Sequence, residues 1–139
     1  MMRTVLALAA GVVIGGFALS HDEKAEIKRK VVSEKDISEK VDGKEAKATT
    51  VELTMEPGQE SAPHRHPGPV FGYVLEGEYE WAIDDQPAKV LKAGDTFYEP
   101  TGCLHRVSKN PSEKGKTRVL AVVLHPRDAK AIAVPEPKK

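Results

Sequence analysis

Residues 57–66 read PGQESAPHRH, and residues 94–105 read GDTFYEPTGCLH. These two blocks contain three of the five histidines in the 139-residue chain. On an extended strand, His64 and His66 project from the same face, with Cα atoms roughly 6.6 Å apart. Two imidazoles at that spacing can reach one metal ion at about 2.0–2.1 Å. If His105 comes from a neighbouring strand, the two blocks together predict a three-histidine metal site.

The hydrophobic pattern around these blocks is that of short strands. Val51, Leu53 and Met55 alternate with polar residues, which is the period of a half-buried strand. Further apolar runs follow at spacings of about 8–12 residues, with glycine and proline between them as turn residues. Little of the chain favours a helix. The pattern therefore predicts an all-β sandwich or barrel.

The two blocks resemble the two motifs of the cupin superfamily. The first motif, G-x5-H-x-H-x3,4-E-x6-G, is matched by Gly58, His64, His66 and Gly77. The second motif, G-x5-P-x-G-x2-H-x3-N, is matched by Gly94, Pro100, Gly102 and His105, with Asn110 one residue late. The resemblance covers residues 47–125 and implies a small jelly-roll (double-stranded β-helix) cupin barrel.

The resemblance also implies a cofactor and its ligands. His64, His66 and His105 are expected to bind one divalent transition metal, and the sequence leaves open iron, manganese, nickel, copper and zinc. Zinc would acidify a bound water, whereas iron would suit oxygen chemistry, as in the thiol-dioxygenase cupins.

One position departs from the first motif. The glutamate that cupins usually offer as a fourth ligand should fall at Val70, and valine cannot ligate. Glu99, six residues before His105, is the nearest replacement, either as a metal ligand or as a general base. The alternative is that Glu99 faces solvent or pairs with an arginine.

Three further residues are candidates for lining a pocket beside the metal. Tyr73 and Tyr98 are the aromatic candidates, while most other aromatic residues are expected to fill the barrel core. Cys103 lies two residues before His105, so an inward thiol would modify the site chemistry. The alternative for Cys103 is a small buried hydrophobe in a tight loop.

Two functions are compatible with these residues. The first is a metal-dependent enzyme, oxygenase-like, that acts on a small organic molecule through the three histidines. The second is a non-catalytic, periplasmic cupin module that binds a small ligand, and a purely structural metal is a third reading. Because cupins host many chemistries, the step from fold to reaction is an analogy.

The two ends of the chain are expected to lie outside the barrel. Residues 1–20 have the basic start, apolar stretch and Ala18-Leu19-Ser20 site of a signal peptide, with an uncleaved anchor as the alternative. Residues 21–46 are a charged lead-in, with a first strand at Val31-Val32 and a turn at Asp42-Gly43. Residues 126–139 are expected to form a flexible tail.

The signal sequence, the net charge and the cysteine count limit where the protein is located and what it binds. The signal sequence predicts a secreted or periplasmic protein without a stable membrane span after cleavage. The formal net charge is zero, which gives no indication of nucleic-acid binding, and a single cysteine excludes an internal disulfide. A homodimer can form if open sheet edges pair, as cupins often do.

Overall fold

The computed structural model describes residues 26–138, so the expected signal peptide lies outside the described residues. This range contains ten strands and no helix. The strands are β1 (Lys28–Val41), β2 (Lys44–Met55), β3 (His64–Arg65), β4 (Val70–Glu76), β5 (Glu78–Ile83), β6 (Lys89–Lys92), β7 (Thr96–Glu99), β8 (His105–Lys109), β9 (Thr117–Pro126) and β10 (Val134–Pro135). Between residues 26 and 138, no helix has the length and apolar character needed to cross a membrane.

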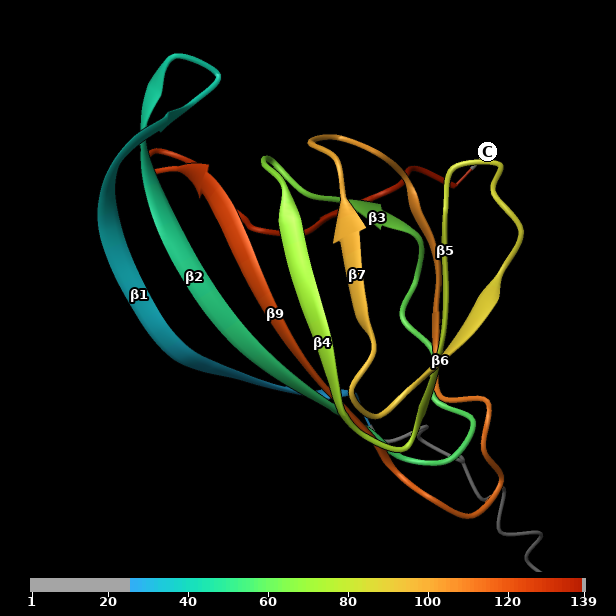
Figure 1. Cartoon of the computed structure of the whole chain (residues 1–139). Coiled ribbons are helices and arrows are strands. Elements are labelled where there is room, and N and C mark those ends of the chain that lie inside the picture. Colours follow the sequence, from blue (N-terminus) through green and yellow to red (C-terminus); the bar gives the residue numbers. More distant parts are fainter. Residues whose placement is uncertain (1–25, 139) are drawn as a thin grey trace, which may run out of the picture.

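The strands form two five-stranded antiparallel sheets, which confirms the predicted jelly-roll class (Figure 1). The first sheet has the order β1-β2-β9-β4-β7, and the second has the order β10-β3-β8-β5-β6. Strands that are distant in sequence are neighbours in both sheets, for example β2 beside β9 and β3 beside β8. This topology brings the two histidine blocks together.

Every second side chain along the strands points into the space between the two sheets and fills it. On β9, Val119, Ala121 and Val123 are buried, and the residues between them are only partly covered. Tyr79 and Trp81 of β5 are buried from the opposite sheet and belong to the same core cluster. The inner faces of both strands therefore follow the period of two that a strand imposes on its side chains.

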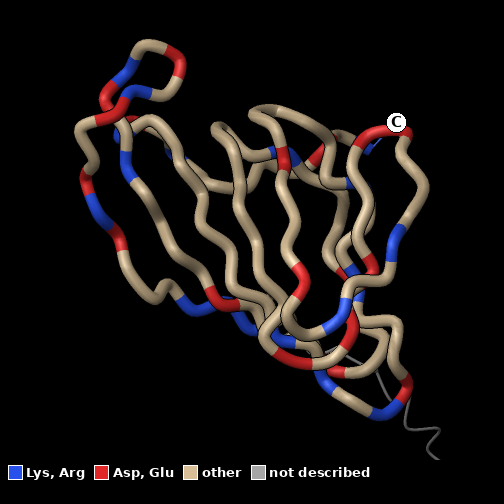
Figure 2. The backbone as a smooth tube through the Cα atoms, viewed as in Figure 1, with Lys and Arg blue, Asp and Glu red and all other residues tan. Residues whose placement is uncertain are grey.

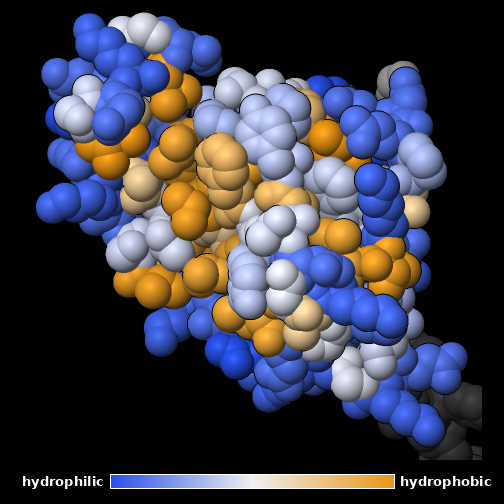
Figure 3. Space-filling model, viewed as in Figure 1, coloured by the Kyte–Doolittle hydropathy of each residue, from blue (hydrophilic) through white to orange (hydrophobic). Residues whose placement is uncertain are grey.

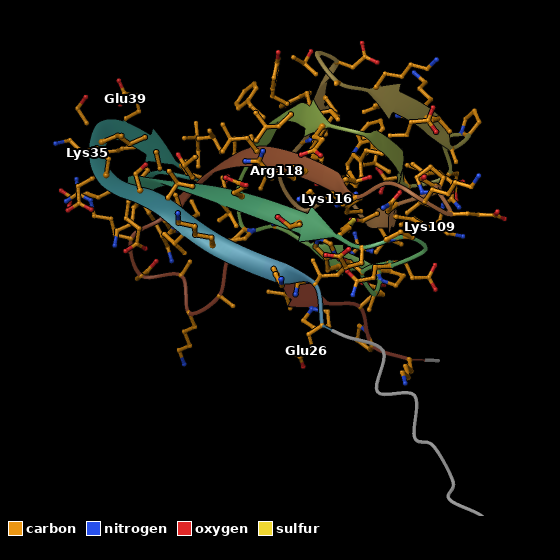
Figure 4. All side chains as sticks on the ribbon, turned by 90° about the horizontal axis from the view of Figure 1, so that it is seen from below. Glu26, Lys35, Glu39, Lys109, Lys116 and Arg118 are labelled. Carbon is orange, nitrogen blue, oxygen red and sulfur yellow. The ribbon has the colours of Figure 1, made fainter. Side chains whose placement is uncertain are left out.

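The charged lead-in is more ordered than the sequence predicted. Residues 28–41 form the 14-residue edge strand β1, which pairs along β2 through a turn at Asp42 and Gly43, where the turn was predicted. Both turn residues have positive φ, at 51° and 74°. Nearly every side chain of β1 is exposed, so the strand carries no alternation from which it could be recognised. Charges gather on this hairpin (Figure 2), and Lys35 and Glu39 lie on its outer part (Figure 4).

The C-terminal segment is also ordered, contrary to the predicted flexible tail. Residues Val134 and Pro135 form β10, which pairs with His64 and Arg65 of β3. The Arg65 guanidinium donates to the Glu136 carboxylate at 2.9 Å and to the carbonyl of Gly102 at 2.8 Å. Arg65 therefore joins the strand of the first histidine block to the C-terminal segment and to the loop before His105. These distant contacts have no signature in the local sequence.

Candidate metal centre

Three histidine side chains meet between the two sheets. His64 is opposite His105 in the register of β3 and β8, and His66 follows directly after β3. The potential ligand nitrogens of the three side chains all lie within 4.8 Å of one another. The ring centroid of His64 lies 4.9 Å from that of His66 and 4.8 Å from that of His105. The structure therefore brings together the three residues that the sequence singled out as ligands.

Backbone carbonyls orient two of these imidazoles. The Nδ1 of His64 lies 2.8 Å from the carbonyl oxygen of Ala62, and the Nδ1 of His66 lies 2.5 Å from that of Ile132. Since a carbonyl oxygen only accepts, each Nδ1 donates its proton. The Nε2 lone pair of each ring is then free to bind a metal, because a metal-binding histidine usually donates its other ring N–H to a carbonyl or carboxylate oxygen.

The three imidazoles are suited to binding a cation because they are neutral. Burial lowers the pKa of His64, and the positive charge of Arg29 lowers it further. Burial also lowers the pKa of His66, and it lowers that of His105 to about 3. All three rings therefore retain a lone pair in neutral solution, as a metal ligand requires.

Glu99 lies inside the barrel beside the histidines, not in solvent. Its side chain is 1% exposed, and β7 places it directly opposite Val70 of β4. A buried carboxylate therefore lies on the strand that pairs with the position where the first motif usually has its glutamate. Oε1 lies 3.2 Å from Nδ1 of His105, and Oε2 lies 3.5 Å from Nε2 of His66.

The Glu99 carboxylate is only partly satisfied by the residues around it. The indole Nε1 of Trp81 donates to Oε1 at 3.1 Å. Among the described residues, neither Oε2 nor Nδ1 of His105 has a hydrogen-bond partner, although both are buried. Burial raises the pKa of Glu99 to about 7, and the bond from Trp81 opposes this rise. Buried polar atoms that converge on one place with three neutral imidazoles fit a bound cation.

Tyr79 and Ser108 form a second polar group against the cluster. The Tyr79 hydroxyl lies 2.8 Å from Oγ of Ser108 and 3.4 Å from Nε2 of His105. Burial raises the pKa of Tyr79, so its hydroxyl stays protonated. The sequence placed Tyr79 among the aromatic residues expected to fill the barrel core, but it gave no indication that Tyr79 contacts a histidine.

The expected pocket residues lie elsewhere. Tyr73 and Tyr98 are 44% and 51% exposed on the outer face of the first sheet, where Tyr98 contacts Phe71 with ring centroids 5.3 Å apart. Outward alternation explains both positions, because Gly72 and Phe97 take the inward ones. Cys103 is buried in the apolar core, and burial raises its pKa to about 11, so it remains a thiol. None of these three residues lines the cavity described next.

A cavity of about 380 Å³ opens beside the histidines. Its apolar wall comes mainly from β2 and β9 of the first sheet, with Val51, Leu53 and Val119 among the residues there. Arg29 of β1 and Ile132 of the C-terminal segment also line it. Sequence reasoning missed these last two, because both lie outside the segment that carries the motifs.

The family comparison agrees with this geometry. The cupin domain model matches residues 51–123, which is more than half of the chain, so the protein belongs to the cupin family. Cupins commonly bind a transition metal, and the three-histidine cluster supplies a matching set of ligands. No curated protein is detectably similar to the chain in sequence.

Several solved structures share the fold. A protein of uncharacterised function with a double-stranded β-helix domain from Klebsiella pneumoniae is 26% identical, with a TM-score of 0.61 over 81% of this chain and 88% of that one. The DMSP lyase DddQ from Ruegeria pomeroyi is 19% identical, with a TM-score of 0.60 over 87% of this chain and 58% of that one. A cupin superfamily protein from Desulfitobacterium hafniense is 17% identical, with a TM-score of 0.55 over 72% and 78% of the two chains. The latter two likenesses concern the fold alone.

The single tryptophan should report binding at this centre. Trp81 is the only tryptophan in the chain, and it bonds to a carboxylate that lies beside His66 and His105. We expect Co²⁺ to quench its fluorescence in a saturable titration with about one ion per chain. The His64→Ala/His66→Ala double variant should show no saturable quenching. Equal quenching of the two proteins would contradict binding at these histidines.

Proposed function

We propose that the protein is a metal-dependent enzyme of the oxygenase type that acts on a small organic molecule. The observation that carries this proposal is the buried Glu99 carboxylate beside the neutral imidazoles of His66 and His105, in a largely apolar cavity that His64 also lines. A protein that only binds a ligand has no need of a buried carboxylate with an unpaired oxygen. Such a group is costly to bury, and strongly perturbed carboxylates cluster at catalytic sites.

His64, His66 and His105 would hold the metal. A divalent transition metal on three neutral ligands keeps coordination positions for oxygen or substrate, and it supplies Lewis acidity or redox chemistry there. Its identity among iron, manganese, nickel, copper and zinc is open. The neutral ligand set leaves the full charge of the ion in the cavity, which favours an anionic or readily deprotonated substrate.

Glu99 would act as the general base, or as a fourth ligand. Trp81 fixes Oε1 by its hydrogen bond, and Oε2 is directed toward the histidines. A pKa near neutrality suits a residue that must both accept and release a proton. Tyr79 and Ser108 would position His105 without taking part in proton transfer.

Glu99→Gln separates the catalytic role from a structural one. The amide preserves shape and removes the base, so turnover should fall by about 10²–10⁴-fold. Metal content, measured by mass spectrometry of untagged protein, should stay within about twofold of wild type if Glu99 is a base, whereas a large loss of metal would make it a ligand. Oxygen uptake should be followed with thiols, diketones and phenolics on iron-loaded protein.

Two controls accompany this experiment. Glu113→Gln alters an exposed loop carboxylate and should change neither metal content nor turnover. The His64→Ala/His66→Ala variant should lose the metal. Unchanged turnover and metal content in Glu99→Gln would remove this residue from the site. Absence of oxygen uptake with every substrate in metal-loaded wild type would favour the alternative, a non-catalytic ligand-binding module.

We also propose that the protein is exported, as the sequence of residues 1–20 predicts. A secreted or periplasmic location would place the barrel among small molecules that enter from outside the cell. Amino-terminal sequencing of the native protein tests this directly, and a mature chain that begins at His21 is expected.

A homodimer would form through the outer face of the first sheet. Phe71, Tyr73, Leu75 and Tyr98 are exposed there, and Figure 3 shows apolar residues over β2, β9 and β4. The charged edge strand β1 is a poorer partner, because lysine and glutamate on an edge oppose pairing. An apolar face of this kind suits a second copy with the same face.

Analytical ultracentrifugation tests the dimer. Wild type should sediment as a dimer, and a Tyr73→Lys/Tyr98→Lys variant should be monomeric with an unchanged circular dichroism spectrum. A Lys35→Glu variant alters only the exposed hairpin and should remain dimeric. Monomeric wild type at high micromolar concentration would contradict the proposal.

A further inference from the structure

We propose that Arg29 anchors the anionic group of the ligand, so that the cavity takes a small organic acid with an apolar body. The inference rests on the proposed function in one respect, because it takes from it the metal ion that lies beside the ligand. The part assigned to Arg29 can nevertheless be measured with or without metal.

Arg29 is positioned to face the cavity. It lies opposite Leu53 in the register of β1 and β2, and both residues line the cavity together with His64. Its guanidinium donates to Oγ of Ser61 at 3.3 Å and to the carbonyl of Ile27 at 3.5 Å. His64, His66 and His105 line the same cavity as Arg29. Arg29 and the candidate metal ligands are therefore both accessible to one bound molecule.

No carboxylate in the described part of the chain balances the charge of Arg29. Three other arginines form salt bridges: Arg65 with Glu136 at 2.9 Å, Arg118 with Glu52 at 2.7 Å and Arg127 with Glu45 at 3.0 Å. Within residues 26–138, Arg29 has no acidic side chain at salt-bridge distance. Its planar fork is suited to binding a carboxylate through two hydrogen bonds.

The rest of the cavity determines the kind of acid. Val51, Leu53, Val119 and Val123 form an apolar wall on the first sheet, and the polar groups are the histidines with their neighbours. A volume of about 380 Å³ lies near the lower end of the roughly 300–1,000 Å³ range of ligand pockets. A ligand with a compact apolar body and one anionic group fits this cavity, because the body would contact the apolar wall and the anionic group would bind Arg29.

The electrostatic balance points to the same class. The three imidazoles are neutral, so Arg29 and a divalent ion leave a net positive charge in the cavity even when Glu99 is ionised. A cationic ligand would be repelled, and a neutral ligand would leave the positive charges of the guanidinium and the ion without an anionic partner. An organic anion would balance both charges.

The test compares acids with amides of the same shape. Isothermal titration calorimetry would measure hexanoate against hexanamide, and phenylacetate against phenylacetamide, on zinc-loaded and metal-free protein. The proteins are wild type, Arg29→Gln, Arg29→Lys and Arg118→Gln. Arg118 is the matched control, because it carries the same charge on the outer face of the first sheet (Figure 4).

In wild type, each acid should bind about tenfold or more tightly than its amide, as charge-assisted hydrogen bonds to an arginine predict. Arg29→Gln should remove this preference, Arg29→Lys should retain part of it, and Arg118→Gln should retain all of it. Equal binding of acid and amide by wild type would overturn the inference, as would no binding of either acid. A preference that persists in Arg29→Gln, or that falls equally in Arg118→Gln, would also overturn it.

Zinc content of the same samples separates this inference from the proposed function. If zinc is bound and the preference does not depend on Arg29, the anion site alone is wrong. If wild type binds no zinc but prefers the acids through Arg29, the anion site is supported and the metal enzyme is not.

Discussion

The approach of the buried Glu99 carboxylate to the imidazoles of His66 and His105 is the interaction on which the site depends. A carboxylate with 1% exposure is costly to bury, and here a single indole donates to it. Burial disfavours its ionised form and raises its pKa to about 7, and the neutral imidazoles do not balance its charge. A cation held by the histidines would satisfy the carboxylate, and a proton would satisfy it in part.

The barrel provides this arrangement through its sheet order. Pairing of β3 with β8 places His64 opposite His105, and pairing of β4 with β7 places Val70 opposite Glu99. The buried carboxylate therefore lies on the strand next to the one where the first motif usually has its glutamate. The C-terminal segment completes the centre, because the Ile132 carbonyl orients His66. The metal centre consequently draws on both sheets and on a segment beyond the family domain.

The sequence predicted the barrel and the histidine cluster because both have local signatures. Alternation identified the inward face of β2, and fixed spacing identified His64, His66 and His105. Long-range contacts have no such signature. The edge strand β1 lacks alternation because both of its faces are exposed, and the C-terminal segment is ordered by pairing with β3. The prediction for Tyr73 and Tyr98 was wrong because the sequence did not show which alternate residues of β4 and β7 face inward.

The central claim is that His64, His66 and His105 bind one metal ion inside the barrel. X-ray absorption spectroscopy of the zinc-loaded protein tests it most directly, because multiple scattering from imidazole rings identifies histidine ligands. We predict three imidazole nitrogens at about 2.0–2.1 Å from zinc. A first shell dominated by oxygen, or a spectrum unchanged in the His64→Ala/His66→Ala variant, would contradict the account.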